Sequence, residues 1–254
     1  TLDHALTEGL TFACFRRPGS PLTLWAQRTP ELERVDRILL FELNDVFLIA
    51  PFAFAPERIP FIRSDVELVD GDLEPEAELL AACEGATRPG PSSQPTSDKT
   101  AFTAGVERIK QRIAEGGLRK AVLSRVLSTP LNSGHLVDLF ASALATHPEA
   151  FVVLMHTPEH GTWMGISPER LLVAQDDRVR VDALAGTRAL DRSAEPWGQK
   201  EQEEQELVTS EVLNTFVHLH LKEVQLHGPE TIDAGASLAV DTAGQADPVS
   251  YTHL

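Results

Sequence analysis

Short apolar stretches separated by turn residues dominate the first 83 residues. The stretches Thr11–Phe15 and Leu22–Trp25 flank Pro18-Gly19-Ser20-Pro21, which is a strong turn signal. The pattern therefore predicts a hairpin that follows a short N-terminal helix. A second hairpin is predicted around Asn44-Asp45, with strands at 38–41 and 46–49.

A segment rich in Gly and Pro separates these hairpins from a better-defined amphipathic helix. Residues 84–97 combine Gly and Pro with small polar residues, which indicates a linker or exposed loop. Ser97 or Asp98 can cap the helix that follows, and Gly116-Gly117 ends it. Its apolar positions step by four, three and four residues: Phe102, Val106, Ile109 and Ile113. Lys120 to Leu127, rich in Val and Leu, is predicted to form a strand.

The second half of the chain alternates predicted helices and strands. One amphipathic helix covers 136–144 and ends before Pro148, and a long helix covers 200–218. Strands are predicted at 151–155, 163–165, 171–173 and 179–184, with a turn at Asp176-Asp177. Because strands outnumber helices and short turns join several of them, the pattern favours an α+β fold of antiparallel sheet with helices packed outside.

Composition and charge narrow the range of functions. The chain has 254 residues, of which 42% are hydrophobic, so it can bury a core and is not disordered throughout. Its 22 Lys and Arg against 38 Asp and Glu give a formal net charge of −16, which disfavours nucleic acid and anionic membrane surfaces as partners. Cys14 and Cys83 cannot form a disulfide scaffold and are predicted to be buried free thiols, so a reducing cytoplasm is expected.

Three short segments could carry chemistry, although each has an ordinary structural explanation. Lys120 could act as a general base, but a lysine at a strand end is more often solvated. Glu169 follows a turn and could donate a proton if it were half-buried. Gly186 and Thr187 could contact an anion through a backbone N–H and a hydroxyl, or they could simply form a β-turn.

An acidic run on the long helix presents a further candidate site. Glu204 stands three and four residues before Leu207 and Val208, so it shares their apolar face, and Glu201 lies one turn earlier. Two carboxylates on a buried face are costly unless a positive partner joins them, and Mg²⁺ is the natural candidate. The alternative is a solvated face near a helix N-terminus, where the helix dipole favours acidic residues.

The order and spacing of these segments resemble the chorismate-utilising enzymes, strongly from about residue 97 to 235. The matching stretches are Lys120–Arg125, Gly165–Glu169, Ala183–Arg188 and Glu204–Val208. Family members that add water are typified by Lys at the position of Lys120, whereas members that add ammonia usually carry Gln there. Some aminodeoxychorismate synthases carry a Lys at the position of Ala185. Both positions favour isochorismate synthase, and the hairpins of residues 1–83 are similar to the menaquinone type.

The resemblance implies a fold, a reaction and a role for each candidate residue. The expected fold is two large antiparallel sheets packed face to face with helices outside. The expected enzyme is an isomerase that adds water at C2 of chorismate and releases the C4 hydroxyl. Lys120 would be the base and Glu169 the acid, and Gly186 and Thr187 would contact the substrate carboxylate. Glu204, with Glu201, would bind Mg²⁺.

Departures from the family pattern leave other interpretations open. Gln205 stands where the family usually has His, and the likeness fades after about Ala239. The sequence is thus interpreted as hairpins (1–83), a linker (84–97), a partial chorismate-binding core (98–239) and a non-family tail (240–254). We expect a longer parent that supplies a second metal-binding Glu and a carboxylate-binding Arg, and that is a monomer. Salicylate synthase, or an inactive fragment, is the alternative, and the product could feed menaquinone or a siderophore.

Overall fold

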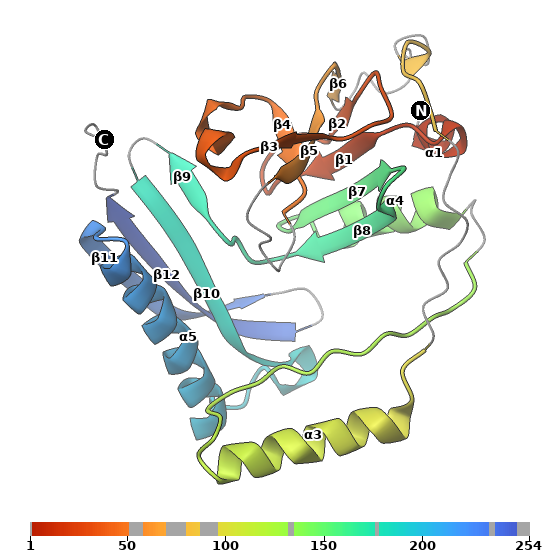
Figure 1. Ribbon diagram of the computed structural model, residues 1–254. Helices are drawn as coiled ribbons and strands as arrows, with labels where there is room; N and C mark the ends of the chain where they lie inside the picture. The colour runs from red at the N-terminus through yellow and green to blue at the C-terminus, as the bar shows by residue number, and fades with distance from the viewer. Residues whose placement is uncertain are drawn as a thin grey trace. The chain divides into compact units, whose positions relative to one another are not determined.

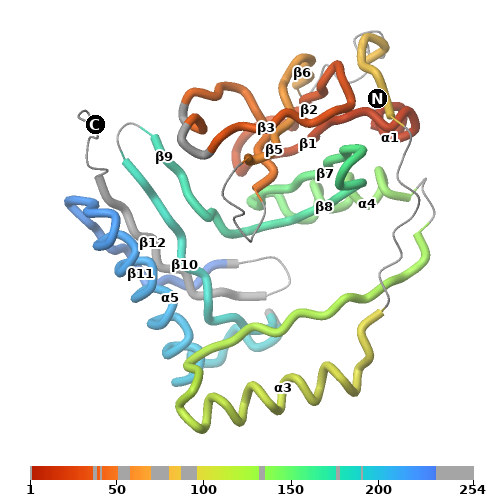
Figure 2. Tube along the Cα trace, viewed as in Figure 1, coloured from red at the N-terminus to blue at the C-terminus, as the bar shows by residue number. Residues whose placement is uncertain are grey.

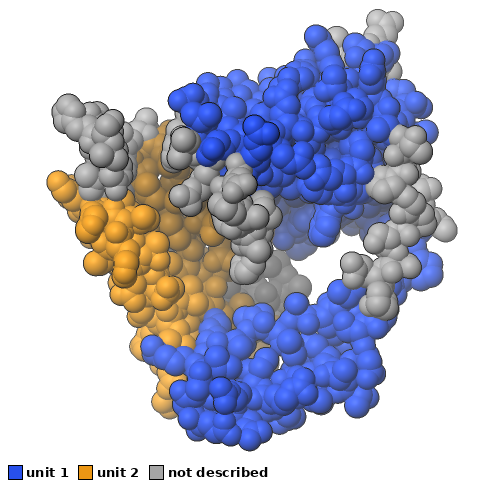
Figure 3. Space-filling model, viewed as in Figure 1, with its two compact units in different colours: residues 1–166 blue, residues 167–254 orange. Residues whose placement is uncertain are grey.

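The computed structural model describes residues 2–50, 58–69, 80–86, 96–131, 135–175, 178–233 and 237–247. The chain divides into two compact units, residues 1–166 and residues 167–254 (Figure 3). Figure 1 labels the helices and strands of both units.

A five-stranded sheet forms the core of the first unit, in the order β6-β2-β1-β7-β8. Its strands are β1 (Phe12–Arg16), β2 (Thr23–Ala26), β6 (Val66–Val69), β7 (Phe151–Thr157) and β8 (Gly161–Ser167). Helices α1 (Leu2–Glu8) and α4 (His135–Thr146) contribute Leu6 and Phe140 to the same buried cluster as Phe12 and Leu154. The antiparallel pairing of Phe12 with Ala26 confirms the first predicted hairpin. The predicted helix at 136–144 and strand at 151–155 are also confirmed.

A second, three-stranded sheet in this unit corrects the prediction for residues 38–49. It consists of β3 (Glu33–Val35), β5 (Ile59–Arg63) and β4 (Val46–Leu48), in the order β3-β5-β4. Residues 38–41 are not a strand but lie in a 3₁₀ helix, Arg37–Glu42, and β4 pairs with β5 instead. In a short apolar run, the spacing of apolar residues does not distinguish a strand from a helical turn. Pairing with a strand distant in sequence therefore determines which residues form a strand here.

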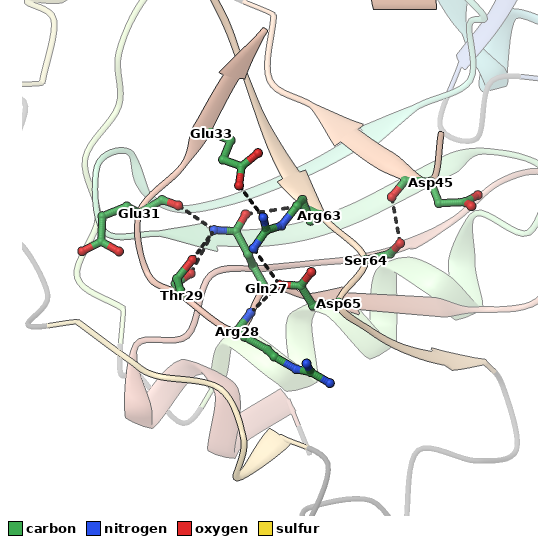
Figure 4. Close-up of polar contacts among 9 residues, drawn as sticks. All are labelled: Gln27, Arg28, Thr29, Glu31, Glu33, Asp45, Arg63, Ser64 and Asp65. Carbon is green, nitrogen blue, oxygen red and sulfur yellow. Dashed lines mark hydrogen bonds and ion pairs between the residues drawn. The ribbon is translucent and has the colours of Figure 1, made fainter. Parts of the chain in front are cut away.

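A buried glutamine holds the loop after β2 against the end of β5 (Figure 4). Gln27 is fully buried, and its Nε2 donates to the carbonyl oxygens of Thr29 and Glu31 at 2.9 and 2.5 Å. Its Oε1 accepts from the backbone N–H of Arg63 at 3.3 Å, and the Arg63 guanidinium pairs with Glu33 and Asp65. These bonds satisfy every polar atom of the Gln27 side chain and connect β2 to the three-stranded sheet.

The predicted helix after residue 97 is confirmed, but the strand after it is not. In α3 (Lys99–Ala114), the Asp98 carboxylate caps the first turn by accepting from Thr100 and Ala101 N–H, and Gly116 follows with φ 75°. Among the described residues, 118–131 join no sheet, and hydrogen bonds from Val126 and Ser128 to residues 96–97 hold the segment (Figure 2). Val122 is 86% exposed. High β-propensity makes a strand only where a neighbouring strand supplies the ladder, so the prediction for 120–127 was wrong.

A four-stranded sheet and one long helix make up the second unit. The sheet order is β11-β12-β10-β9, from β9 (Val173–Gln175), β10 (Arg178–Ala189), β11 (Lys222–Asp233) and β12 (Ser237–Asp247). A short 3₁₀ turn, Leu190–Arg192, leads to α5 (Gln199–His218), which packs against β10 and β12. The helix predicted at 200–218 is confirmed. The boundary predicted at residue 240 falls inside β12, and the turn at 176–177 and residues 248–254 lie outside the described residues.

The antiparallel pairings and the separate helices confirm the predicted α+β class. In the part of the chain that the structure covers, no helix has the length and apolar character to cross a membrane. The linker predicted at 84–97 falls largely on residues 87–95, which lie outside the described residues, and it stays a prediction.

The two free thiols should differ in reactivity. Cys14 is buried in β1, where burial raises its pKa to about 12, whereas Cys83 is half-buried and its pKa is raised less, by burial and the charge of Asp65. We expect iodoacetamide at mildly alkaline pH to modify Cys83 well before Cys14, measured by mass spectrometry of the two peptides. Equal native-state rates would contradict this burial.

The raised pKa of Cys14 also predicts a direction for stability against pH. Above the ordinary thiol pKa of 9.0, the thiol of the unfolded chain ionises while the folded one keeps its proton. The unfolded state then binds fewer protons, so the free energy of unfolding contributed by Cys14 falls as pH rises between 9.0 and about 12. Denaturant titrations of the wild type and Cys14→Ala should show this loss only where the thiol is present.

Candidate active site

The residues predicted to act in the site come from both units. Lys120 belongs to the first unit, where it is half-buried at the start of the unpaired segment 118–131. The remaining candidates all belong to the second unit and lie on the turn after β8, on β10 and on α5: Glu169, Gly186, Thr187, Glu201 and Glu204. These five residues therefore share one compact unit.

The Glu169 carboxylate is hydrogen-bonded to the middle of β10. Its Oε1 accepts from the backbone N–H of Leu184 at 3.1 Å, and its own backbone N–H and carbonyl contact the hydroxyl of Ser167. The sequence predicted that Glu169 could donate a proton if it were half-buried. In the structure the residue is exposed, so burial does not support this role. The bond from Leu184 orients the carboxyl through one of its two oxygens.

A buried aspartate that sequence reasoning missed fixes the turn carrying Glu169. The Asp182 side chain is 5% exposed, and its two oxygens accept from Arg170 Nε at 2.8 Å and Arg180 Nε at 3.3 Å. The backbone N–H of Asp182 also donates to the Arg170 carbonyl at 3.3 Å. Because Arg170 follows Glu169 directly, this pair holds the turn against β10. The only sequence signal was a charged residue within the predicted strand 179–184.

Strand β10 carries a bulge where Gly186 and Thr187 lie. Leu184 lies opposite Asp241 and Thr187 opposite Ala239, so two residues of β10 face one residue of β12. Gly186 is buried and Thr187 is exposed. Such a bulge disrupts the ladder locally and re-aims the residues beside it, and bulges of this kind are common next to active sites. The local geometry is therefore compatible with the contact role predicted for these two residues.

The acidic run on α5 divides into two classes. Glu201 and Glu204 are half-buried, on the side of the helix that carries Leu207 and Val208, whereas Glu203 and Glu206 are exposed. The Glu204 side chain is 29% exposed and lies 3.6 Å from Lys200 Nζ. The apolar face predicted from residue spacing is confirmed, although the metal-binding role of the two acids stays a prediction.

The position of Glu201 also fits a helix-capping explanation. Gly198 is the N-cap of α5 and has no side chain to accept from the first backbone N–H groups. A Cβ placed on Gly198 would lie 2.7 Å from Glu201 Oε2, so this carboxylate folds back over its own helix N-terminus. A negative group there is stabilised by the helix dipole. Hard oxygen donors on one helix face also suit Mg²⁺, but the described residues hold no cluster of three or more acidic, His or Cys side chains suited to a metal.

A pocket of about 320 Å³ adjoins the start of α5. Two predicted residues, Thr187 and Glu201, line it together with Arg188, Arg192 and Glu195. The Arg188 guanidinium lies over the Trp197 ring at 3.7 Å from its centroid and donates to the carbonyls of Glu195 and Pro196. The hydrogen bond from Arg192 lowers the pKa of the Glu195 carboxyl and raises the pKa of the guanidinium. The cations of this pocket are thus already engaged with the surrounding loop.

Comparisons with known proteins show which family the chain is similar to. The sequence profile of the chorismate binding enzymes matches residues 63–211, more than half of the chain. Anthranilate synthase component 1 of Geobacillus stearothermophilus is 31% identical over 149 residues, which are 57% of this chain and 28% of that protein. Isochorismate synthase MenF of Escherichia coli K12 is 31% identical over 128 residues, 45% of this chain and 29% of that protein.

The fold is similar to that of a solved isochorismate synthase. The structure of MenF, the menaquinone-specific isochorismate synthase from Escherichia coli, aligns with a TM-score of 0.69 and 18% sequence identity. The alignment covers 95% of this chain and 65% of that chain. The chain spans less than a third of the length of each of these two curated relatives.

Replacing Asp182 should test whether it holds the turn after β8. Asp182→Asn removes the charge that pairs with Arg170 and Arg180, so we expect a loss of about 1–3 kcal/mol in the free energy of unfolding of this unit. Asp191→Asn, at an exposed position, is the matched control and should change it by less than about 0.5 kcal/mol. Equal denaturation midpoints for the two variants would rule out the structural role given to Asp182.

Proposed function

Because the chain belongs to the family of chorismate binding enzymes, we propose that it contributes the active site of an isochorismate synthase. The observation that carries the proposal is a lysine at position 120. Water must lose a proton to become an effective nucleophile, whereas ammonia already offers a lone pair. A base at this position therefore favours water, and Ala185 offers no amine for a covalent alternative.

The proposed reaction exchanges one hydroxyl for another. Lys120, in its neutral form, accepts a proton from water as the water oxygen bonds to C2 of chorismate. Both ring double bonds shift, from C1=C2 to C1=C6 and from C5=C6 to C4=C5, the C4–O bond breaks, and Glu169 gives its proton to the departing hydroxyl. One water enters and one leaves, so the product is an isomer of the substrate. The hydrogen bond from Leu184 to Glu169 supports this role because it orients the carboxyl.

Binding of the substrate is assigned to β10 and α5. Gly186, through its backbone N–H, and Thr187, through its hydroxyl, would contact a substrate carboxylate beside the bulge. Glu204 and Glu201 would hold Mg²⁺, whose charge would offset that of the carboxylate. Two carboxylates suit this ion, which binds through few protein ligands and keeps water or substrate oxygens in its other positions. This local charge would also let an acidic protein accept an anionic substrate.

Two other activities, anthranilate synthase and salicylate synthase, are the alternatives to this proposal. The likeness to an anthranilate synthase component favours ammonia as the nucleophile, with nitrogen at C2 of the product. Salicylate synthase shares Lys120 and Glu169 in the resemblance and would also eliminate pyruvate. The product of the full-length protein distinguishes the three. Cytoplasmic location, a monomeric state and a menaquinone or siderophore destination stay predictions.

Replacing Lys120 should separate water addition from ammonia addition. In the full-length protein, Lys120→Gln removes the base, so we expect isochorismate formation to fall by about 10²–10⁴-fold while chorismate binding persists. A trace of aminated product is expected when ammonium is supplied. Lys110→Gln, at an exposed position of α3, is the control and should retain full activity. Isochorismate formation at the wild-type rate in Lys120→Gln would show that Lys120 is not the base.

Two acids on α5 should differ in their effect on Mg²⁺ dependence. Glu204→Ala removes a half-buried carboxylate and should abolish the activation of the full-length protein by Mg²⁺. Glu206→Ala removes an exposed one and should leave the Mg²⁺ titration unchanged. Equal losses in both titrations would mean that the run acts as an undifferentiated solvated face.

A further inference from the structure

A glutamine of α5 is buried against β10 and bonded to that strand. Gln205 is 4% exposed, and both ends of its carboxamide are bound. Its Oε1 accepts from the backbone N–H of Ala185 at 3.2 Å, while its Nε2 donates to the Ala183 carbonyl at 2.7 Å. Nε2 also lies 3.4 Å from the hydroxyl of Thr209, one turn along the helix. The carboxamide therefore links the helix to the strand both as a hydrogen-bond acceptor and as a donor.

These contacts fall at the bulge of β10. The register shifts between Leu184 and Thr187, so Ala185 and Gly186 together face a single residue of β12. A bulge leaves its extra residue without a ladder partner, and a buried N–H without an acceptor costs free energy. Gln205 satisfies the N–H of Ala185 at this point. It therefore fixes the backbone that leads into Gly186 and Thr187.

We propose that Gln205 is a positioning residue: its carboxamide holds the bulge of β10 so that Gly186 and Thr187 meet the substrate carboxylate from a fixed backbone. The inference rests on the proposed function only in taking Gly186 and Thr187 as the carboxylate contacts. Gln205 also follows Glu204 directly, so the same side chain ties the helix of the proposed metal ligands to the strand of the proposed substrate contacts.

The side-chain chemistry explains why a glutamine suits this position. An apolar residue of similar size would fill the space but leave the Ala185 N–H and the Ala183 carbonyl without partners. A carboxylate would offer acceptors only and would face the Ala183 carbonyl unfavourably. The uncharged carboxamide supplies one donor and one acceptor at the required separation, so the role depends on hydrogen bonding and not on volume.

The test replaces Gln205 by methionine, which keeps the length and loses the hydrogen bonds. In the full-length Gln205→Met protein, we expect the Ala185 amide to exchange with solvent at least about tenfold faster by NMR, because its acceptor is gone. Amides at 179–181, where β10 pairs regularly with β12, should keep their wild-type rates. Gln202→Met, at an exposed position of the same helix, is the matched control and should change neither.

Kinetics then separate positioning from simple structural support. Looser carboxylate contacts weaken binding in the ground and transition states alike, so KM for chorismate should rise about tenfold while kcat changes by less than about twofold. Unchanged Ala185 exchange would overturn the proposal, and so would faster exchange with an unchanged KM. The rate of chorismate consumption is measured with whichever nucleophile the enzyme uses, water or ammonia. The KM comparison therefore tests the role of Gln205 even if the product is aminated.

A measurement on the wild-type protein keeps the test valid if the methionine variant does not fold. The side-chain amide protons of Gln205 should exchange more slowly than those of exposed Gln202, because both carboxamides donate to a backbone carbonyl but only that of Gln205 is buried. Added chorismate should shift the Ala185 amide resonance. Exchange as fast as that of Gln202, or an Ala185 resonance unaffected at saturating chorismate, would overturn the proposal.

Discussion

The hydrogen bonds between the Gln205 carboxamide and β10 are the contacts on which the backbone leading into Gly186 and Thr187 depends. They hold the strand at its bulge, where ladder pairing with β12 is interrupted. A few residues earlier, Asp182 attaches the turn that carries Glu169 to the same strand. Strand β10 is thus bonded to α5 through Gln205 and to the turn after β8 through Asp182. Both side chains are buried and have hydrogen-bond partners, which favours one backbone path over its alternatives.

Lys120 is held in a different way from the residues of the second unit. Its segment joins no sheet among the described residues. Further along the segment, the Val126 carbonyl accepts from Ser97 N–H, and Ser128 N–H donates to the Thr96 hydroxyl, just before α3. Phe102 on α3 lies under the Arg125 guanidinium, 5.5 Å from its ring centroid, so the helix and the segment pack on each other. The segment that carries Lys120 thus packs on α3, whereas Glu169, Gly186 and Thr187 lie on or beside β10.

The sequence predicted the elements whose signals are local and missed those that depend on distant partners. Asp98 as a cap and Gly116 as a stop bounded α3 because both act within one helical turn. Residues 38–41 and 120–127 carry strand-like composition, but no neighbouring strand pairs with them in the described chain. In the site, spacing placed Glu204 on the half-buried face. It did not reveal Asp182, whose partner Arg170 lies on another element, nor the use that β10 makes of Gln205.

If the proposed function is right, the enzyme adds water and not ammonia at C2 of chorismate, and the origin of the new C2 substituent distinguishes the two. The full-length enzyme is given chorismate and Mg²⁺ in oxygen-18-labelled water with ammonium present, and the product is analysed by mass spectrometry and NMR. We predict isochorismate with one labelled oxygen at C2 and no incorporated nitrogen. A product that carries nitrogen at C2, or isochorismate without the label, would contradict it.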